Sequence, residues 1–163
     1  MRIIGIDPGL SGAIAVLDDQ KVKCIFDMPV MSEGKKNKRQ LNSALLVSLL
    51  KENINSKEDT IIVVEQVNAM PGQGVTSMFN FGQTFGAIKG ISAALGLPIF
   101  FVRPAKWKKH FELINSSKDA SRTKAIEMYP LLSGQLSKKK DVNKSDAILI
   151  ARFYSETSFD YKQ

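Results

Sequence analysis

The first part of the chain alternates short apolar runs with polar turns. Residues 2 to 7, about 12 to 18 and about 22 to 27 are rich in Ile, Val, Leu and Phe, and residues 8 to 12 and 18 to 20 separate them. Apolar runs of this length, joined by short turns containing Gly, Pro and Asp, are typical of an antiparallel meander. The pattern therefore predicts three neighbouring strands of one sheet.

A polar stretch and a leucine-rich stretch follow the meander. Residues 31 to 40 contain Gly34 and a group of basic residues: Lys35, Lys36, Lys38 and Arg39. This composition predicts an exposed loop, which is either a solvated charge run or a segment that touches DNA. Between residues 41 and 50 leucines recur with helical spacing, which predicts a helix covering one face of the sheet.

Two later apolar runs complete the predicted sheet. Residues 60 to 65 are apolar at consecutive positions and end in Glu65, as expected of a parallel strand covered on both faces. Residues 98 to 102 form a second such run. The sequence thus predicts an α/β fold with a mixed five-stranded sheet, a three-stranded antiparallel meander plus two parallel strands, flanked by helices.

A long helix is predicted between these two strands, with Thr76 or Ser77 as its N-cap. Gly82, Gly86 and Gly90 recur at every fourth position along it, which leaves one stripe of the helix without side chains. Each glycine costs about 1 kcal/mol relative to alanine, so some contact must compensate. We expect close packing within the chain, with a two-fold dimer contact as the alternative.

Two more helices are predicted in the last third of the chain. One spans residues 117 to 129 and places Lys118 and Arg122 on one face. The other closes the chain, with Asp146 in its first turn and an apolar run after it. An acid in a first turn suits the helix dipole and is ordinary by itself.

Length and cysteine content limit the class of protein. A chain of 163 residues with 44% hydrophobic content is long enough to bury one core, so we expect a single domain over residues 1–163. Cys24 is the only cysteine, which excludes an intramolecular disulfide and Cys-based zinc motifs. No apolar stretch precedes Asp7 as a signal peptide would, and we expect a cytoplasmic protein.

The positive charge is concentrated in one segment. The formal net charge is +7, and residues 103 to 144 hold eleven Lys or Arg against four Asp or Glu, whereas the rest of the chain is balanced. Such a local surplus suits a polyanion such as nucleic acid. Lys106, Trp107 and Lys108 interleave bases with an aromatic ring, a pattern that binds phosphates and stacks on bases, although Trp107 could equally cover the core. His110 is the only histidine, and no residue stands at the spacing from it that a metal-binding pair or triad would need, so we expect it at the surface.

Three acids stand at the ends of predicted elements. Asp7 and Glu65 each end a strand, and Asp146 starts a helix. Each has an ordinary explanation alone, since an Asp before Pro-Gly is also a common turn. Ligands of α/β proteins gather outside the carboxyl ends of the strands, so the three acids together predict one site.

The order of these motifs resembles the RuvC-type Holliday junction resolvases of the ribonuclease H-like nuclease superfamily. The segments that carry the resemblance are Gly-Ile-Asp-Pro-Gly at 5 to 9, Val-Glu-Gln-Val at 64 to 67, Phe-Gly-Gln-Thr-Phe-Gly at 81 to 86 and Ser-Asp-Ala at 145 to 147. Residues 68 to 74 and 104 to 108 look most like the phage-encoded branch. The resemblance runs in order along essentially the whole chain.

The resemblance implies a homodimeric, magnesium-dependent crossover junction endodeoxyribonuclease that nicks four-way DNA junctions, in the cytoplasm of a bacterium or of a phage-infected host. Two Mg²⁺ ions per site, with Mn²⁺ as a substitute, would stabilise charge on the attacking and leaving oxygens. Asp7 would bridge the ions, and Glu65 and Asp146 would each hold one side.

Two positions depart from the family pattern. Where bacterial members have a fourth acid or histidine ligand, this chain has Asn143, a weaker neutral ligand; Asp141 is a nearby alternative, provided that the helix starts late enough. Where bacterial relatives insert an aromatic wedge into the junction, this chain has Asn68, with Met70 or Phe79 as substitutes. We therefore expect a structure-selective nuclease with relaxed sequence preference.

The expected DNA-contacting residues come from the basic segment, from the helix after it and from the loop after Glu65: Lys106, Trp107, Lys108, Lys118, Arg122, Met70 and Gln73. Two other functions stay open on the sequence. One is a ribonuclease H-like hydrolase acting on RNA:DNA hybrids, which would use the same acids. The other is a catalytically silent, branched-DNA-binding dimer, which Asn143 in place of an acid favours.

Overall fold

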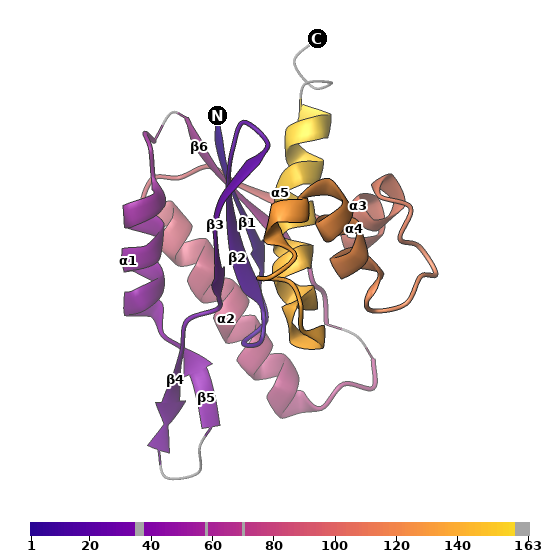
Figure 1. Cartoon of the computed structure of the whole chain (residues 1–163). Coiled ribbons are helices and arrows are strands. Elements are labelled where there is room, and N and C mark those ends of the chain that lie inside the picture. The colour runs from indigo at the N-terminus through magenta and orange to yellow at the C-terminus, as the bar shows by residue number, and fades with distance from the viewer. Residues whose placement is uncertain (35–37, 58, 70, 159–163) are drawn as a thin grey trace.

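A five-stranded mixed sheet forms the centre of the protein in the computed structural model, which describes residues 1–34, 38–57, 59–69 and 71–158 (Figure 1). Its strand order is β3-β2-β1-β6-β7. The strands are β1 (Arg2–Asp7), β2 (Ala13–Asp18), β3 (Lys21–Asp27), β6 (Thr60–Glu65) and β7 (Ile99–Val102). Pairing is antiparallel from β1 to β3 and parallel between β1 and β6 and between β6 and β7. The predicted meander plus two parallel strands is confirmed.

Helices cover both faces of this sheet (Figure 1). On one face lie α1 (Ser43–Asn53) and α2 (Val75–Ala94). On the other lie α3 (Pro104–His110), α4 (Ala120–Met128) and α5 (Val142–Thr157). Successive residues of β1 enter different cores, since Ile3 packs on the α5 side and Ile4 on the α1 and α2 side. Burial on both faces explains why the central strands are apolar without alternation.

Short 3-10 helices complete the C-terminal part: η2 (Pro130–Leu132) and η3 (Lys139–Asp141). Among the described residues, none of the helices combines the length and the apolar character needed to cross a bilayer. Cys24 is half-buried on β3, where its thiol lies 3.3 Å from the Asn53 side-chain oxygen.

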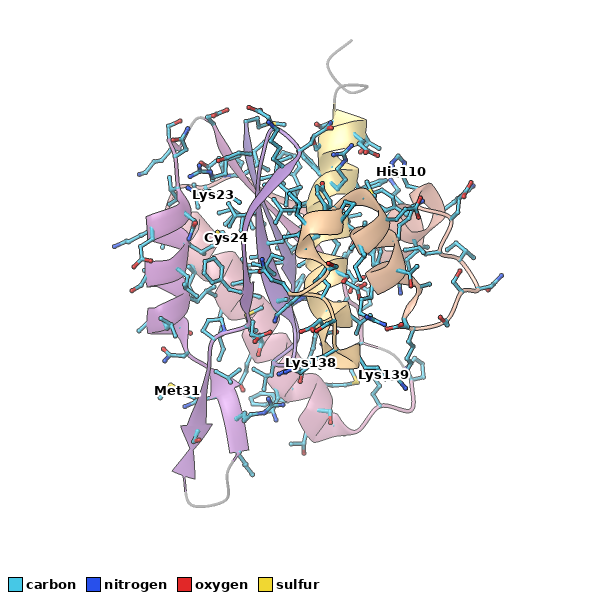
Figure 2. The ribbon with its side chains drawn as sticks, viewed as in Figure 1. Lys23, Cys24, Met31, His110, Lys138 and Lys139 are labelled. Carbon is cyan, nitrogen blue, oxygen red and sulfur yellow. The ribbon has the colours of Figure 1, made fainter. Side chains whose placement is uncertain are left out.

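The polar stretch after β3 is a β-ribbon, where the sequence predicted a loop. It consists of β4 (Val30–Glu33) and β5 (Lys38–Leu41), paired antiparallel as a separate two-stranded sheet. The ribbon projects from the body at the end where α2 and α5 begin (Figure 1), and Met31 on β4 lies well away from the main sheet (Figure 2). Hydrogen bonding between the two backbone segments forms these strands although their side chains are mostly polar.

The starts of three helices differ from the prediction. Gly74, rather than Thr76 or Ser77, is the N-cap of α2. Helix α4 begins at Ala120, so Lys118 lies in the segment before it and does not share a helical face with Arg122. Helix α5 begins at Val142, which places Asp146 just beyond the first turn.

The expectation that the glycine stripe packs within the chain is wrong. A Cβ atom added at Gly82, Gly86 or Gly90 would meet nothing within 4 Å among the described residues, and all three glycines are exposed. The stripe therefore faces outward, on the side of α2 away from the sheet.

Candidate active site

Two carboxylates lie side by side because β1 and β6 are parallel and in register. Ile6 pairs with Val64, so Asp7 and Glu65, the next residue of each strand, meet at the same edge of the sheet. Gly12 makes the turn after Asp7 possible: a Cβ on Gly12 would lie 2.0 Å from the Asp7 carbonyl oxygen. The absence of a side chain at Gly12 thus accommodates the chain's own backbone.

The third carboxylate reaches this edge because α5 packs directly on β1. A Cβ added at Gly5 would lie 2.3 Å from the Ala147 carbonyl oxygen and 2.8 Å from the Ala151 Cβ. Only glycine permits this approach of the helix to the strand. Asp146, the residue before Ala147, is thereby brought to the end of β1 that carries Asp7.

The three acids influence one another electrostatically. Burial, followed by the negative charges of Glu65 and Asp146, raises the pKa of Asp7 to about 7. Burial also raises the pKa of Asp146 to about 6; the Ser121 hydroxyl opposes this rise, and the Glu65 charge adds to it. Mutual effects of this kind require charges that lie near one another. The structure therefore brings Asp7, Glu65 and Asp146 into one electrostatic neighbourhood.

The donor chemistry of this site fits a hard divalent cation. Asp146 Oδ1 is buried and has no hydrogen-bond partner among the described residues, and carboxylate oxygens are the ligands that Mg²⁺ and Mn²⁺ prefer. Within the described ranges, however, no group of three or more His, Cys, Asp or Glu residues is already arranged to hold a metal ion.

Trp107 is part of the acidic site and not a DNA-stacking surface. Its side chain is 0% exposed, so the expectation that its ring stacks on DNA bases is wrong. The indole Nε1 instead donates a hydrogen bond of 2.9 Å to Glu65 Oε1. Lys108 lies beside it, with Nζ 5.3 Å from the indole centroid, and its charge lowers the pKa of both Asp7 and Asp146.

A hollow of about 250 Å³ opens next to Asp146. Basic, hydroxyl and amide side chains line much of it: Lys108, Ser116, Ser117, Lys118, Ser121 and Asn143. Lys138 and Lys139 lie at the same end of α5 (Figure 2). This end of the protein thus combines the carboxylates with groups that can bind phosphate oxygens.

A larger and mostly apolar hollow, of about 530 Å³, lies between the loop after β6 and the first half of α2. Gln73 and Asn68 line it, together with Phe81 and Phe85. The acids do not line it, so its size does not mark the chemical centre. Met70, predicted as a DNA contact or wedge, is outside the described residues, and Phe79 is 65% exposed on α2.

The two candidates for a fourth ligand differ in their contacts. Asp141 is buried, accepts a hydrogen bond from the Lys138 backbone N–H and forms an ion pair with Lys144. Both of its oxygens are therefore used in the turn before α5, which argues against a ligand role. Asn143 donates its amide N–H to the Ser11 carbonyl at 2.6 Å, and its side chain lines the hollow beside Asp146.

The predicted phosphate contacts also separate into two groups. Lys106 and Lys118 are exposed, as a DNA contact requires. Arg122 is bound within the protein: it forms two hydrogen bonds to Asp119 and donates a third to the Leu136 carbonyl. The structure thus argues against Arg122 as a free DNA contact.

Sequence reasoning missed the Trp107–Glu65 hydrogen bond and the Ser121 hydroxyl. The strand register could have indicated the Trp107–Glu65 hydrogen bond. Val102 of β7 pairs with Glu65, and α3 starts two residues after Val102, with Pro104 as its first residue. A side chain on the first turn of α3 can then reach Glu65. Ser121 had no such signal, because its position depends on how α4 packs against α5.

The strand order and the covering helices define a ribonuclease H-like fold of the RuvC type. Two solved structures have this fold. Thermus thermophilus RuvC matches with a TM-score of 0.55 at 19% identity over 97% of each chain, and T. thermophilus RuvC in complex with a Holliday junction substrate matches with 0.53 at 17% identity over 96% of each chain.

A further solved structure, the fowlpox virus Holliday junction resolvase, is 15% identical over 97% of this chain and 99% of that chain, with a TM-score of 0.49. No protein-family model matches the sequence, and no curated protein matches it either. The likeness to known proteins is therefore one of fold.

Proposed function

We propose that the protein is a structure-selective DNA endonuclease that resolves Holliday junctions and other branched DNA by metal-dependent phosphodiester hydrolysis. The observation that carries this proposal is the meeting of Asp7, Glu65 and Asp146 at one sheet edge, in a fold shared with a protein solved on a Holliday junction. Residues 1–163 act as one nuclease domain, in the cytoplasm of a bacterium or a phage-infected host.

The three carboxylates share one role in this proposal. Asp7, Glu65 and Asp146 would together hold the divalent cations, which would supply Lewis-acid stabilisation of the phosphodiester oxygens. The unpartnered Asp146 oxygen and the raised pKa values of Asp7 and Asp146 support the assignment, because a bound cation would relieve both. Asn143, beside them, can contribute its amide oxygen.

The DNA backbone is proposed to lie across the hollow beside Asp146. Lys108 and Lys118 line this hollow and Lys106 is exposed on the same helix as Lys108. Lysines bind phosphates without reading base sequence. Since Asn68 stands where the family pattern places an aromatic wedge, recognition by junction shape rather than by sequence follows.

A homodimer is proposed, with the outer face of α2 as its contact. Val75 is 87% exposed and Phe79 65% exposed on this helix, and the outward glycine stripe leaves its backbone open to close approach. Two antiparallel copies would place two active sites on one junction, which suits paired nicks.

The test is a cleavage panel with mobile and fixed four-way junctions, flaps, linear duplex and RNA:DNA hybrid, each with and without Mg²⁺. We expect nicks in the junctions and flaps only when Mg²⁺ or Mn²⁺ is present. Asp146→Asn should abolish cleavage while sparing junction binding, because the substitution weakens cation binding and leaves the phosphate-binding lysines in place.

The other outcomes of this panel point to other functions. Cleavage confined to the RNA strand of the hybrid would identify a ribonuclease H-like hydrolase. Junction binding without cleavage in either metal would identify a silent binding dimer, the function that Asn143 favours. Loss of junction binding in Asp146→Asn would show that this acid supports the fold.

A further inference from the structure

The only tryptophan of the chain is placed where it acts on Glu65. Trp107 is completely buried, and its Nε1–H is directed at Glu65 Oε1 over 2.9 Å. The rest of the ring packs among apolar side chains that include Phe111, Ala125 and Ala147. The indole is thus buried in the apolar core and offers its single polar atom to one carboxylate.

The backbone around the pair is as firmly positioned as the ring. Glu65 ends β6, pairs with Val102 of β7, and is followed by Gln66, whose N–H donates to the Val102 carbonyl. Helix α3 begins at Pro104, and proline presets the first helical φ. The donor and the acceptor therefore come from elements that the sheet holds in fixed register.

A glutamate without such a partner has three side-chain torsions to restrict before it can ligate a cation. The Trp107 hydrogen bond holds one carboxylate oxygen, and no described residue donates a hydrogen bond to the other, which lies in the electrostatic neighbourhood of Asp7 and Asp146. Partners that orient a ligating group in this way typically change metal affinity by about 10- to 100-fold when they are removed. An aliphatic or phenyl side chain could fill the same space but could not donate.

We propose that Trp107 is a positioning residue that orients the Glu65 carboxylate for divalent-cation binding. The inference rests on the metal-dependent function proposed above, and it assigns to the chain's one tryptophan a role through Glu65, without contact with DNA. Trp107→Phe keeps most of the ring and removes the donor, so it separates orientation from packing.

The experiment is calorimetric titration of the DNA-free protein with Mn²⁺, which needs no catalytic turnover. Trp107→Phe should bind Mn²⁺ about 10- to 100-fold more weakly than the unsubstituted protein, with an unchanged circular dichroism spectrum and unchanged binding to a four-way junction in EDTA. Phe111→Leu is the matched control, because Phe111 belongs to the same buried cluster and its phenyl side chain has no hydrogen-bond donor to offer Glu65. It should lower the melting temperature and leave Mn²⁺ affinity unchanged.

A double-substitution cycle tests whether the tryptophan acts through Glu65. In a Glu65→Gln background, Trp107→Phe should weaken Mn²⁺ binding no further. A full additional loss there, or equal Mn²⁺ affinity of Trp107→Phe and the unsubstituted protein, would overturn the inference. If the unsubstituted protein binds Mn²⁺ and cleaves junctions, and Trp107→Phe has the same Mn²⁺ affinity, only the role of Trp107 is overturned. If the unsubstituted protein binds no divalent cation, the proposed metal-dependent function is overturned as well.

A second readout covers the case in which Trp107→Phe does not fold. The single indole N–H resonance in a ¹H–¹⁵N spectrum of the unsubstituted protein should shift as Mg²⁺ is added, because the hydrogen bond changes when its acceptor becomes a ligand. The shift should be absent in Glu65→Gln. An indole N–H resonance whose chemical shift does not change at Mg²⁺ concentrations that support cleavage would contradict the positioning role.

Discussion

At this site, the charged form of a buried carboxylate is destabilised, as the raised pKa values of Asp7 and Asp146 show. The pKa of Asp7 is about 7 in the folded state, because burial and the neighbouring acids disfavour its charge. In an unfolded chain the same group ionises near its ordinary pKa of 3.8. Ionisation of Asp7 in the folded protein therefore opposes folding at neutral pH, and the proposed cation would reverse this effect.

The sign of the resulting pH dependence follows from proton uptake. Between about pH 4 and pH 7 the folded state holds more protons at Asp7 than the unfolded state, so the free energy of unfolding falls as pH rises through this window. The difference between the folded and unfolded pKa of Asp7 corresponds to about 4 kcal/mol. Asp7→Asn should thus become more stable relative to the unsubstituted protein between about pH 4.5 and about pH 8, by up to about that amount.

Urea unfolding in EDTA at both pH values measures this difference, with Glu52→Gln on the exposed surface of α1 as the control. Mg²⁺ at the higher pH should stabilise the unsubstituted protein and leave Asp7→Asn unaffected. Parallel stability profiles for the two proteins would show that Asp7 does not titrate in this environment.

The acids were predictable because strand ends can be located from local patterns, whereas several other residues were not. The sequence indicated that Arg122 and Trp107 belong to a basic DNA surface, but Asp119 and two carbonyls engage the arginine, and Glu65 accepts from the buried indole. Both outcomes depend on partners distant in sequence or on burial, which composition does not determine.

Among the elements, those with strong apolar patterns were predicted and the polar ribbon was not. The bounds of β1 and β6 agree with the sequence prediction, since both strands are buried on two faces. Lys38, Arg39 and Gln40 of β5 are all exposed, so the strand shows no alternation that would distinguish it from a loop. Its pairing with β4 stabilises it instead.

The ribbon leads to a prediction about DNA binding. It projects at the end of the sheet that carries the acids (Figure 1), and Arg39 Nη2 lies 3.2 Å from Ser11 Oγ in the loop after Asp7. A two-stranded ribbon is narrow enough to enter a DNA groove. Lys38→Ala combined with Arg39→Ala should weaken junction binding and flatten its salt dependence by about 0.9 in slope for each phosphate that these side chains neutralise.

Lys21→Ala combined with Lys23→Ala is the matched control, since it removes the same charge from the start of β3, at the opposite end of the sheet. Binding titrations over a series of salt concentrations compare the two variants. Equal salt dependence of junction binding in the two variants would mean that Lys38 and Arg39 do not contact DNA phosphates. An unchanged salt dependence of binding, with slower cleavage at saturating DNA, would mean that Arg39 acts by positioning the loop after Asp7 through its contact with Ser11.

At the scale of the whole molecule, the outer face of α2 is the feature that the monomer leaves unexplained. The exposed Val75 and Phe79 and the outward glycines lie on this helix, and Phe101 of the edge strand β7 packs beside it against Phe85. Glycine in a helix interior costs about 1 kcal/mol relative to alanine, and no neighbour in the described part of the chain requires it here. The second copy of the chain in the proposed homodimer would supply a reason for these glycines.

Gly86→Arg tests this explanation. None of the described atoms lies within 4 Å of the position of an added Cβ, so the substitution does not strain the monomer, and a long charged side chain should block close approach of another helix. Light scattering should give twice the 18.0 kDa chain mass for the unsubstituted protein and the chain mass for Gly86→Arg. Gly134→Arg is the control, because Gly134 is equally open but lies outside α2.

The same variants should differ in the products they form from a supercoiled plasmid that extrudes a cruciform. Two active sites bound to one junction can make both nicks before dissociating, and the product is then a linear molecule. A monomer makes one nick, which relaxes the supercoiling and removes the cruciform before a second nick can follow. Gly86→Arg should therefore yield nicked circles, whereas Gly134→Arg should yield linear plasmid. A dimeric Gly86→Arg that still forms linear product would place the dimer contact elsewhere on the molecule.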